Sequence, residues 1–325
     1  MPRVRRTVLR VIPAIQLTRL TMAFGAVSDV WFVILLSRAT GHFEHMPVAQ
    51  MHLAVAMLVG AAVAIGLFAY GAALNDILDA KHDSTFSPDR PIPAGRIRPG
   101  QAVVMTVAAL LVSMLAAEAF GTPAMWVAML TAAAVLFYNA AGRFVPAVGL
   151  VTIGLIHAAH MLITNVQLTF MVPVWLVMTH AMCIALLVHV LEDKRPRMTR
   201  QAVFATALGW TFWSVVLLGI GALRDGRVDE LLSWPQAIAP RAAVLGFVLV
   251  ARWKTRRVAG RVGAEKLTRY GAMWQSLYGA SWLLALGFYR EALWIGLFAL
   301  AGFTAMTLIK EVTGLTGEPV SYRHR

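Results

Sequence analysis

Long apolar runs recur along almost the whole chain, and they restrict its possible folds more than any other feature. The runs "LVGAAVAIGLFAYGAAL" at 58–74 and "VVMTVAALLVSMLAAEAF" at 103–120 approach the roughly 20 residues that a helix needs to cross a bilayer. In lipid, a helix bonds every backbone N–H and C=O within one segment. The 325 residues are 59% hydrophobic and only 14% charged, whereas soluble domains carry about 25% charge. The sequence therefore predicts an all-α, polytopic transmembrane helical bundle that forms a single domain over residues 1–325.

The apolar segments give the number of membrane spans. We expect spans at 13–36, 51–74, 102–120, 123–141, 146–164, 171–191, 202–223, 236–252, 270–289 and 291–309. The segment at 236–252 is the shortest and contains Pro240 and Arg241, so the prediction is nine or ten spans. The first segment follows the basic stretch "MPRVRRTVLRVIPAIQ", and Arg19 interrupts its apolar run. We therefore expect a retained helix and not a cleaved signal peptide.

Lys and Arg gather in alternate connecting segments. The intervening segments hold only Arg38, Arg224, Arg227 and Arg290. Because basic residues concentrate in cytoplasmic loops, the amino terminus is predicted to be cytoplasmic, and we expect an integral protein of a bacterial inner (cytoplasmic) membrane. The same loops account for the net charge of +13 without nucleic acid, since no basic stripe carries interleaved aromatic residues on a soluble element. The single cysteine, Cys183, excludes an intrachain disulfide framework and cysteine-based zinc or iron–sulfur sites.

One charged stretch, "NDILDAKHDSTFSPDRPIPAGRIR" at 75–98, follows directly on the second apolar segment. Asn75, Asp79 and Asp83 are spaced i, i+4, i+8, and Asp76 lies three residues before Asp79. If the second helix continues through this stretch, these side chains share one face at its cytoplasmic end. Clustered carboxylates repel one another and need cations. An oxygen-only cluster suits Mg²⁺, which takes one or two carboxylates together with phosphate oxygens.

The basic residues of the same stretch complete a candidate diphosphate site. Lys81 and Arg90 are expected to donate hydrogen bonds to phosphate oxygens. The alternative is a polar surface loop with a capping Asp and exposed ion pairs. The regular spacing at the end of an apolar span favours the diphosphate site.

The motif NDxxDxxxD at Asn75–Asp83, followed by "DRPIPAGRI" at Asp89–Ile97, resembles the first signature of the UbiA-type intramembrane prenyltransferases. The resemblance implies transfer of a prenyl group from a prenyl diphosphate to an aromatic or other lipophilic acceptor within the membrane. It implies that Asn75, Asp76, Asp79 and Asp83 hold the Mg²⁺ that bridges to the diphosphate, and that the three aspartates are catalytic residues. It also implies a UbiA-like bundle, usually of nine spans, whose cavity opens near the cytoplasmic side.

Two further segments match the family by position. In "LFYNAAGRF", Tyr138 and Arg143 occur where the family has a tyrosine and a basic residue at the cytoplasmic end of the fourth span, which implies a catalytic Tyr138 and a substrate-binding Arg143. The family's second aspartate motif, typically DxxxDxxxD, follows the sixth span. This chain has "HVLEDKRPRMTR" there, at 189–200.

The second segment departs from the family pattern because it keeps only two carboxylates, Glu192 and Asp193, and they are adjacent. Neighbouring helical residues point about 100° apart, so the pair is unlike a shared metal site. We infer a weakened or altered second metal site with Asp193 as its candidate ligand. The other candidate diphosphate contacts here are His189, Glu192, Lys194 and Arg195.

Ionisable residues inside spans are also functional candidates. Asp29 is expected to pair with a neighbouring helix or to line an acceptor pocket. His157 and His160 lie on one face of the fifth span, and we interpret them and His180 as core histidines or as hydrogen-bond donors to an acceptor.

Three alternatives to an active prenyltransferase were considered. The first is a catalytically altered relative that binds or moves an isoprenoid lipid without prenyl transfer, which the basic second loop favours. A secondary transporter is disfavoured because no internal repeat or broken midplane helix is evident. An alcohol phosphatidyltransferase is disfavoured because a DGxxAR-type motif is absent from the sequence. The sequence leaves the acceptor and the prenyl chain length open.

Overall fold

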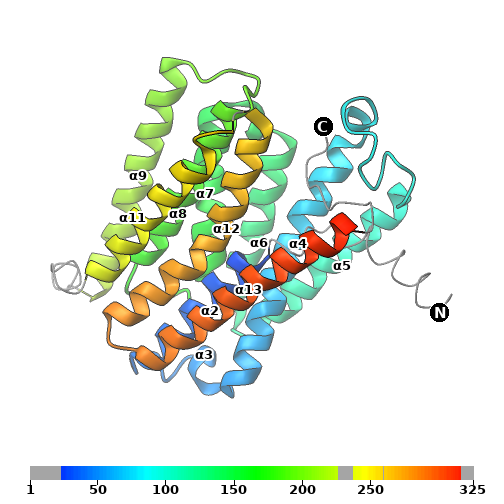
Figure 1. The fold of residues 1–325 in the computed structure, drawn as a ribbon. Helices are drawn as coiled ribbons and strands as arrows, with labels where there is room; N and C mark the ends of the chain where they lie inside the picture. Colours follow the sequence, from blue (N-terminus) through cyan, green and yellow to red (C-terminus); the bar gives the residue numbers. More distant parts are fainter. Residues whose placement is uncertain (1–22, 226–236, 259, 316–325) are drawn as a thin grey trace.

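The computed structural model describes residues 23–225, 237–258 and 260–315, and within these residues it contains helices and no strand (Figure 1). The helices are α2 (Phe24–Ala39), α3 (Pro47–Gln50), α4 (Leu53–Phe86), α5 (Pro99–Glu118), α6 (Thr122–Ala140), η2 (Gly142–Phe144), α7 (Pro146–Leu162), α8 (Val172–Leu191), α9 (Arg200–Asp225), α11 (Ile238–Thr255), α12 (Gly260–Ala285) and α13 (Tyr289–Leu315). The predicted all-α class is confirmed.

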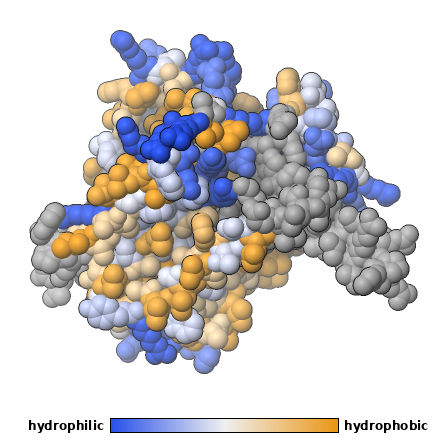
Figure 2. All heavy atoms as spheres, in the orientation of Figure 1, coloured by the Kyte–Doolittle hydropathy of each residue, from blue (hydrophilic) through white to orange (hydrophobic). Residues whose placement is uncertain are grey.

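Each predicted membrane segment overlaps one long helix among the described residues. Arg19 and the start of the first segment lie outside them. By length and composition, five helices can cross a membrane, namely α4, α5, α6, α8 and α9, and α7 is a shorter apolar helix. Hydrophobic side chains cover the middle of the face in Figure 2, with hydrophilic ones toward its two ends. The choice between nine and ten spans stays a prediction.

Proline sets where several of these helices begin. Pro99, Pro123, Pro146 and Pro173 occupy the first turn of α5, α6, α7 and α8. Proline is favoured there because its missing N–H has no intrahelical partner at that position and its fixed φ suits a helix. The short connections between α5, α6 and α7 follow from these starts.

Helix α4 extends well past the apolar run that predicts it. At a rise of about 1.5 Å per residue, its 34 residues span roughly 51 Å, against about 30 Å for the hydrocarbon core. Its last turns therefore project beyond the apolar layer and carry Asn75–Asp83 in helical register. This is the continuation on which the face prediction depended.

Helix α2 is buried on all sides and joins two parts of the core. Phe32 and Leu36 pack in a cluster with α7, α8 and α12, and Val30 and Ile34 pack in a second cluster with α4, α5 and α6. Packing of α2 on α12 is close because Gly25 has no side chain. A Cβ at Gly25 would lie 2.2 Å from the backbone oxygen of Ala272 and 2.7 Å from Oε1 of Gln275. Small residues allow such approach between membrane helices.

We predict that Gly25→Ala destabilises the protein by about 1–3 kcal/mol, because the added methyl group collides with a backbone carbonyl that cannot rotate away. Thermal unfolding of detergent-purified protein, followed by circular dichroism, measures the effect. Gly296→Ala in α13 is the control, since a Cβ there meets nothing within 4 Å. The control should gain about 0.5–1 kcal/mol from reduced chain entropy in the unfolded state. Equal melting temperatures for the two variants would contradict the packing argument.

Candidate functional site

The last turns of α4 gather the polar side chains of the first motif on one face. Asn75 Nδ2 donates to Asp79 Oδ2 at 3.2 Å and to Asp76 Oδ1 at 3.4 Å. Asp76 and Asp83 are 5% and 4% exposed, although they lie at the end of the helix. The i, i+4 spacing therefore brings Asn75 and Asp79 together, as the sequence predicts, and the buried carboxylates of the motif are Asp76 and Asp83.

Arg90 binds two of these carboxylates with one nitrogen. Its Nη1 donates to Asp83 Oδ2 at 2.5 Å and lies 3.4 Å from Asp76 Oδ1. The loop after α4 places Arg90 there by local bonds and by burial. Arg90 N–H donates to Ser87 O at 3.0 Å, while Ile92 and Ile97 are buried in a small cluster with residues of α4 and α5.

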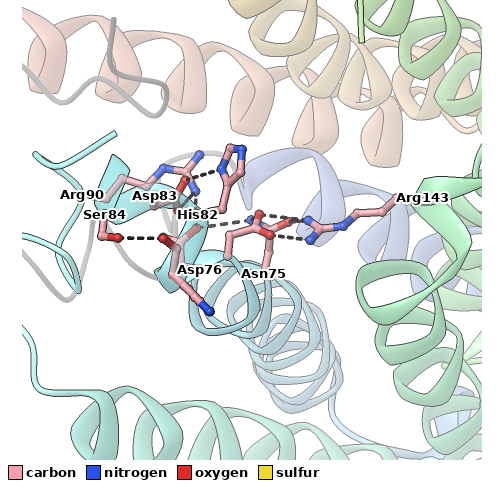
Figure 3. A network of polar contacts seen from close by, with 9 residues as sticks. Asn75, Asp76, His82, Asp83, Ser84, Arg90 and Arg143 are labelled. Carbon is pink, nitrogen blue, oxygen red and sulfur yellow. Dashed lines mark hydrogen bonds and ion pairs between the residues drawn. The ribbon is translucent and has the colours of Figure 1, made fainter. Parts of the chain in front are cut away.

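Arg143 reaches the motif from the opposite side, as Figure 3 shows. Its Nη1 donates to Asp79 Oδ2 at 2.9 Å and to Asn75 Oδ1 at 3.1 Å, and its Nη2 donates to Asp79 Oδ1. This two-pronged contact is the strong geometry for a guanidinium and a carboxylate. The hydrogen bond to Asp79 raises the pKa of Arg143, which stays charged.

The single turn η2 positions Arg143. Helix α6 ends at Ala140, and Phe144 N–H donates to Ala141 O at 3.1 Å before Pro146 starts α7. The guanidinium also lies 5.0 Å from the centre of the Phe144 ring. Asn75 and Arg143, 68 positions apart in the sequence, are thus brought into contact.

Other candidate residues of this region lie differently. Lys81 is exposed, and its backbone carbonyl accepts the Ser84 hydroxyl at 2.7 Å, so the structure does not bring its charge into the cluster. Tyr138 is partly buried and lies in the last turn of α6, five residues before Arg143. Sequence reasoning did not single out His82, whose Nδ1 lies 3.8 Å from Asp83 Oδ1. Its position next to Asp83 in the chain was the only available signal.

The donor set can be tested for Mg²⁺. Within the described residues, no three His, Cys, Asp or Glu side chains are arranged to hold a metal ion together. Asp76 and Asp83 nevertheless approach one common point, which the shared nitrogen of Arg90 marks. Two carboxylates are enough for Mg²⁺ when waters and phosphate oxygens complete its shell. Asp76 and Asp83 therefore fit the ion, whereas Asp79 and Asn75 are engaged by Arg143.

The second motif does not form a comparable cluster. Glu192 Oε2 lies 3.2 Å from Lys194 Nζ, and Asp193 accepts hydrogen bonds from Arg197 Nε and Nη2 at 3.2 and 3.3 Å. These hydrogen bonds hold the pKa of Asp193 below its usual value. Arg195 is exposed, with Nη2 4.0 Å from Asp193 Oδ2.

His189 also faces its own loop. Its Nε2 lies 3.0 Å from Pro196 O, and because a carbonyl only accepts, Nε2–H is the donor. The hydrogen bonds and ion pairs named here for the second motif thus join residues between 189 and 197.

Polar groups also occur within the bundle. His157 Nδ1 lies 3.1 Å from Gln275 Nε2, and His180 Nδ1 lies 3.1 Å from the Tyr278 hydroxyl. Both histidines thus behave as hydrogen-bonded core residues, one of the two interpretations made from the sequence. Asp29 is 3% exposed, and its Oδ2 has no hydrogen-bond partner in the described part of the chain.

Comparison with known proteins adds independent findings. The sequence model of the UbiA prenyltransferase family matches residues 30–260. A digeranylgeranylglyceryl phosphate synthase from Methanothrix thermoacetophila is 34% identical over 83 residues, which are 26% of this chain and 31% of that protein. The match thus spans about a third of that relative's length.

Two solved structures share the fold. One, from work on structural and mechanistic insights into the biosynthesis of digeranylgeranylglyceryl phosphate synthase in membranes, gives a TM-score of 0.57 at 16% identity, over 85% of this chain and 98% of that one. The other is the apo structure of a UbiA homolog from Aeropyrum pernix K1, with a TM-score of 0.52 at 15% identity, over 82% and 98%. At these identities the two structures support the fold alone. Because the family model covers well over half of the sequence, this chain is an integral membrane protein that belongs to the UbiA prenyltransferase family.

Proposed function

We propose that this protein transfers a prenyl group from a prenyl diphosphate to a lipophilic acceptor within the membrane, with Mg²⁺ at the first motif. The observation that carries the proposal is the pair of buried carboxylates, Asp76 and Asp83, that converge on one cationic nitrogen of Arg90. Burying a carboxylate costs free energy unless a cation compensates its charge, so two buried carboxylates argue against the alternative of a simple polar surface loop. Family membership supports the same reaction class.

The acidic and basic residues of the proposed site have different roles. Asp76 and Asp83 would hold the metal, whose chemistry is to neutralise the diphosphate leaving group. Arg90 and Arg143 donate hydrogen bonds to diphosphate oxygens as negative charge develops on them. Asp79 orients Arg143 through the two-pronged contact, and Asn75 ties Asp79 to the rest of the motif. Tyr138 lies beside Arg143 and is proposed to face the reacting prenyl carbon.

The proposed reaction also depends on the exclusion of water around the first motif. A prenyl cation in water would be quenched, so the reaction needs a site that excludes water. The first motif ends an apolar helix packed on α5, α6 and α2, which provides such surroundings on the bundle side. The partial relative is named for a geranylgeranyl transfer to a glyceryl phosphate, so acceptors outside the aromatic class belong in the test.

We predict that purified protein in lipid vesicles converts radiolabelled geranyl, farnesyl or geranylgeranyl diphosphate into a lipid-soluble product with Mg²⁺ and a pool of aromatic and glycerol-phosphate acceptors. Asp83→Asn should lower turnover on the order of a hundredfold, because one of the two carboxylates proposed to hold the metal is lost. Asp89→Asn is the matched control in the loop after α4, since Asp89 is exposed and the bond given for it in the described part of the chain is from Arg96 to its backbone carbonyl. Donor binding without product across the pool would favour the alternative, a relative that binds or moves an isoprenoid lipid.

We also predict that Asp79 and Arg143 are energetically coupled. Asp79→Asn and Arg143→Gln each leave a half-buried charge unpaired, so the double variant should recover about 1–2 kcal/mol relative to the sum of the single effects. Unfolding in mixed micelles of increasing dodecyl sulfate content measures the four free energies. Asp193→Asn with Arg197→Gln is the control cycle and should show no measurable coupling, because that pair is exposed. Additive effects at Asp79 and Arg143 would remove the positioning role assigned to Asp79.

A further inference from the structure

The two carboxylates of the α8–α9 loop face different surroundings. The side chain of Glu192 is 11% exposed, whereas that of Asp193 is 65% exposed. Glu192 caps α8, and Asp193 follows it with φ at 46°, in the left-handed region that turns the chain away from the helix. One side chain therefore packs inward and the other points to solvent, so the two cannot approach one ion together.

Local hydrogen bonds fix this arrangement. Glu192 N–H donates to Val188 O at 3.0 Å, Lys194 N–H donates to His189 O at 3.1 Å, and the His189 ring is bonded to Pro196 O. Turning Asp193 inward would break the Lys194–His189 bond and the contact with Arg197. The backbone thus holds Asp193 away from the bundle.

The charge of this loop has the opposite sign from the first motif. Between 192 and 200 the chain has two carboxylates and four cationic side chains, namely Lys194, Arg195, Arg197 and Arg200. The loop lies at the same end of the bundle as the end of α4 (Figure 1). A diphosphate bound at that end would meet a loop of net positive charge, and Arg195, with the longest ion-pair distance of the loop, is the side chain most readily redirected to it.

We propose that this chain holds one divalent cation, at Asp76 and Asp83, and that the α8–α9 loop holds none and supplies positive charge to the diphosphate through Arg195. The inference rests on the proposed prenyl-transfer function and specifies its charge arrangement. It assigns Asp193 to the structure of the loop and not to the metal ligands that the family pattern implies.

Equilibrium dialysis of detergent-purified protein against Mn²⁺ counts the ions directly. Farnesyl thiolodiphosphate, whose bridging sulfur prevents prenyl release, is held at one free concentration on both sides, with empty micelles as the blank. We expect one bound ion per chain. Asp83→Asn should lose it, whereas Asp193→Asn should keep both the number and the affinity within about twofold, as an exposed pair would. Two ions in the wild type, no ion, or an ion lost in Asp193→Asn would overturn the proposal.

The role of Arg195 has its own measurement. Arg195→Gln should weaken binding of farnesyl thiolodiphosphate severalfold without changing the Mn²⁺ count, and Arg195→Lys should recover most of the affinity. Unchanged binding in Arg195→Gln would overturn this part. The dialysis does not depend on turnover. One bound ion with no product in the vesicle assay would therefore contradict the proposed function but not the one-cation arrangement. Product formed with two bound ions would contradict the one-cation arrangement but not the proposed function.

Discussion

Buried carboxylates at the end of an apolar helix need cations, and the arrangement around α4 follows from that need. Asp76 and Asp83 are almost inaccessible, and an uncompensated buried charge costs several kcal/mol, typically about 3–5 when one partner is removed. Arg90, from the loop after α4, pairs with Asp76 and Asp83, and Arg143, from η2 on the other side, pairs with Asp79. The loop after α4 and the short turn between α6 and α7 thus both contact the first motif, Asn75, Asp76, Asp79 and Asp83.

The bundle supplies the rigidity that these contacts require. Helix α2 is buried between two core clusters, and α4 packs against α2, α5 and α6. Because three helices pack against α4, its final turns are held in place. The side chains of Asn75, Asp79 and Asp83 therefore keep their positions relative to one another. Distant packing and local charge pairing therefore act on the same element.

The sequence predicted what depends on periodicity. Apolar length located the helices, and the i, i+4 spacing predicted the contact between Asn75 and Asp79. It gave both Lys81 and Arg143 as substrate contacts, and it could not show which of these basic residues lies against the motif. Lys81 is near in sequence but exposed, whereas Arg143 is 64 residues from Asp79 and is brought there by the α6–α7 turn.

The second motif also shows what the sequence can and cannot predict. Adjacency of Glu192 and Asp193 already indicated that they could not act as a family-type pair, since neighbouring residues diverge. Which of the two turns outward depends on where α8 ends, and helix ends are the features that periodicity predicts least well. The left-handed conformation of Asp193 settles the direction, and its exposure allows Arg197 to pair with it.

The two motifs therefore have opposite charge: the first motif is acidic and the α8–α9 loop is basic. In the described part of the chain, the first motif presents three carboxylates to two guanidinium groups, a donor set that a divalent cation can join. In the α8–α9 loop basic side chains outnumber carboxylates, so the loop attracts an anion without a metal. A ligand that presents a metal to one side and bare phosphate oxygens to the other matches both, and a prenyl diphosphate bound with a single cation has that character.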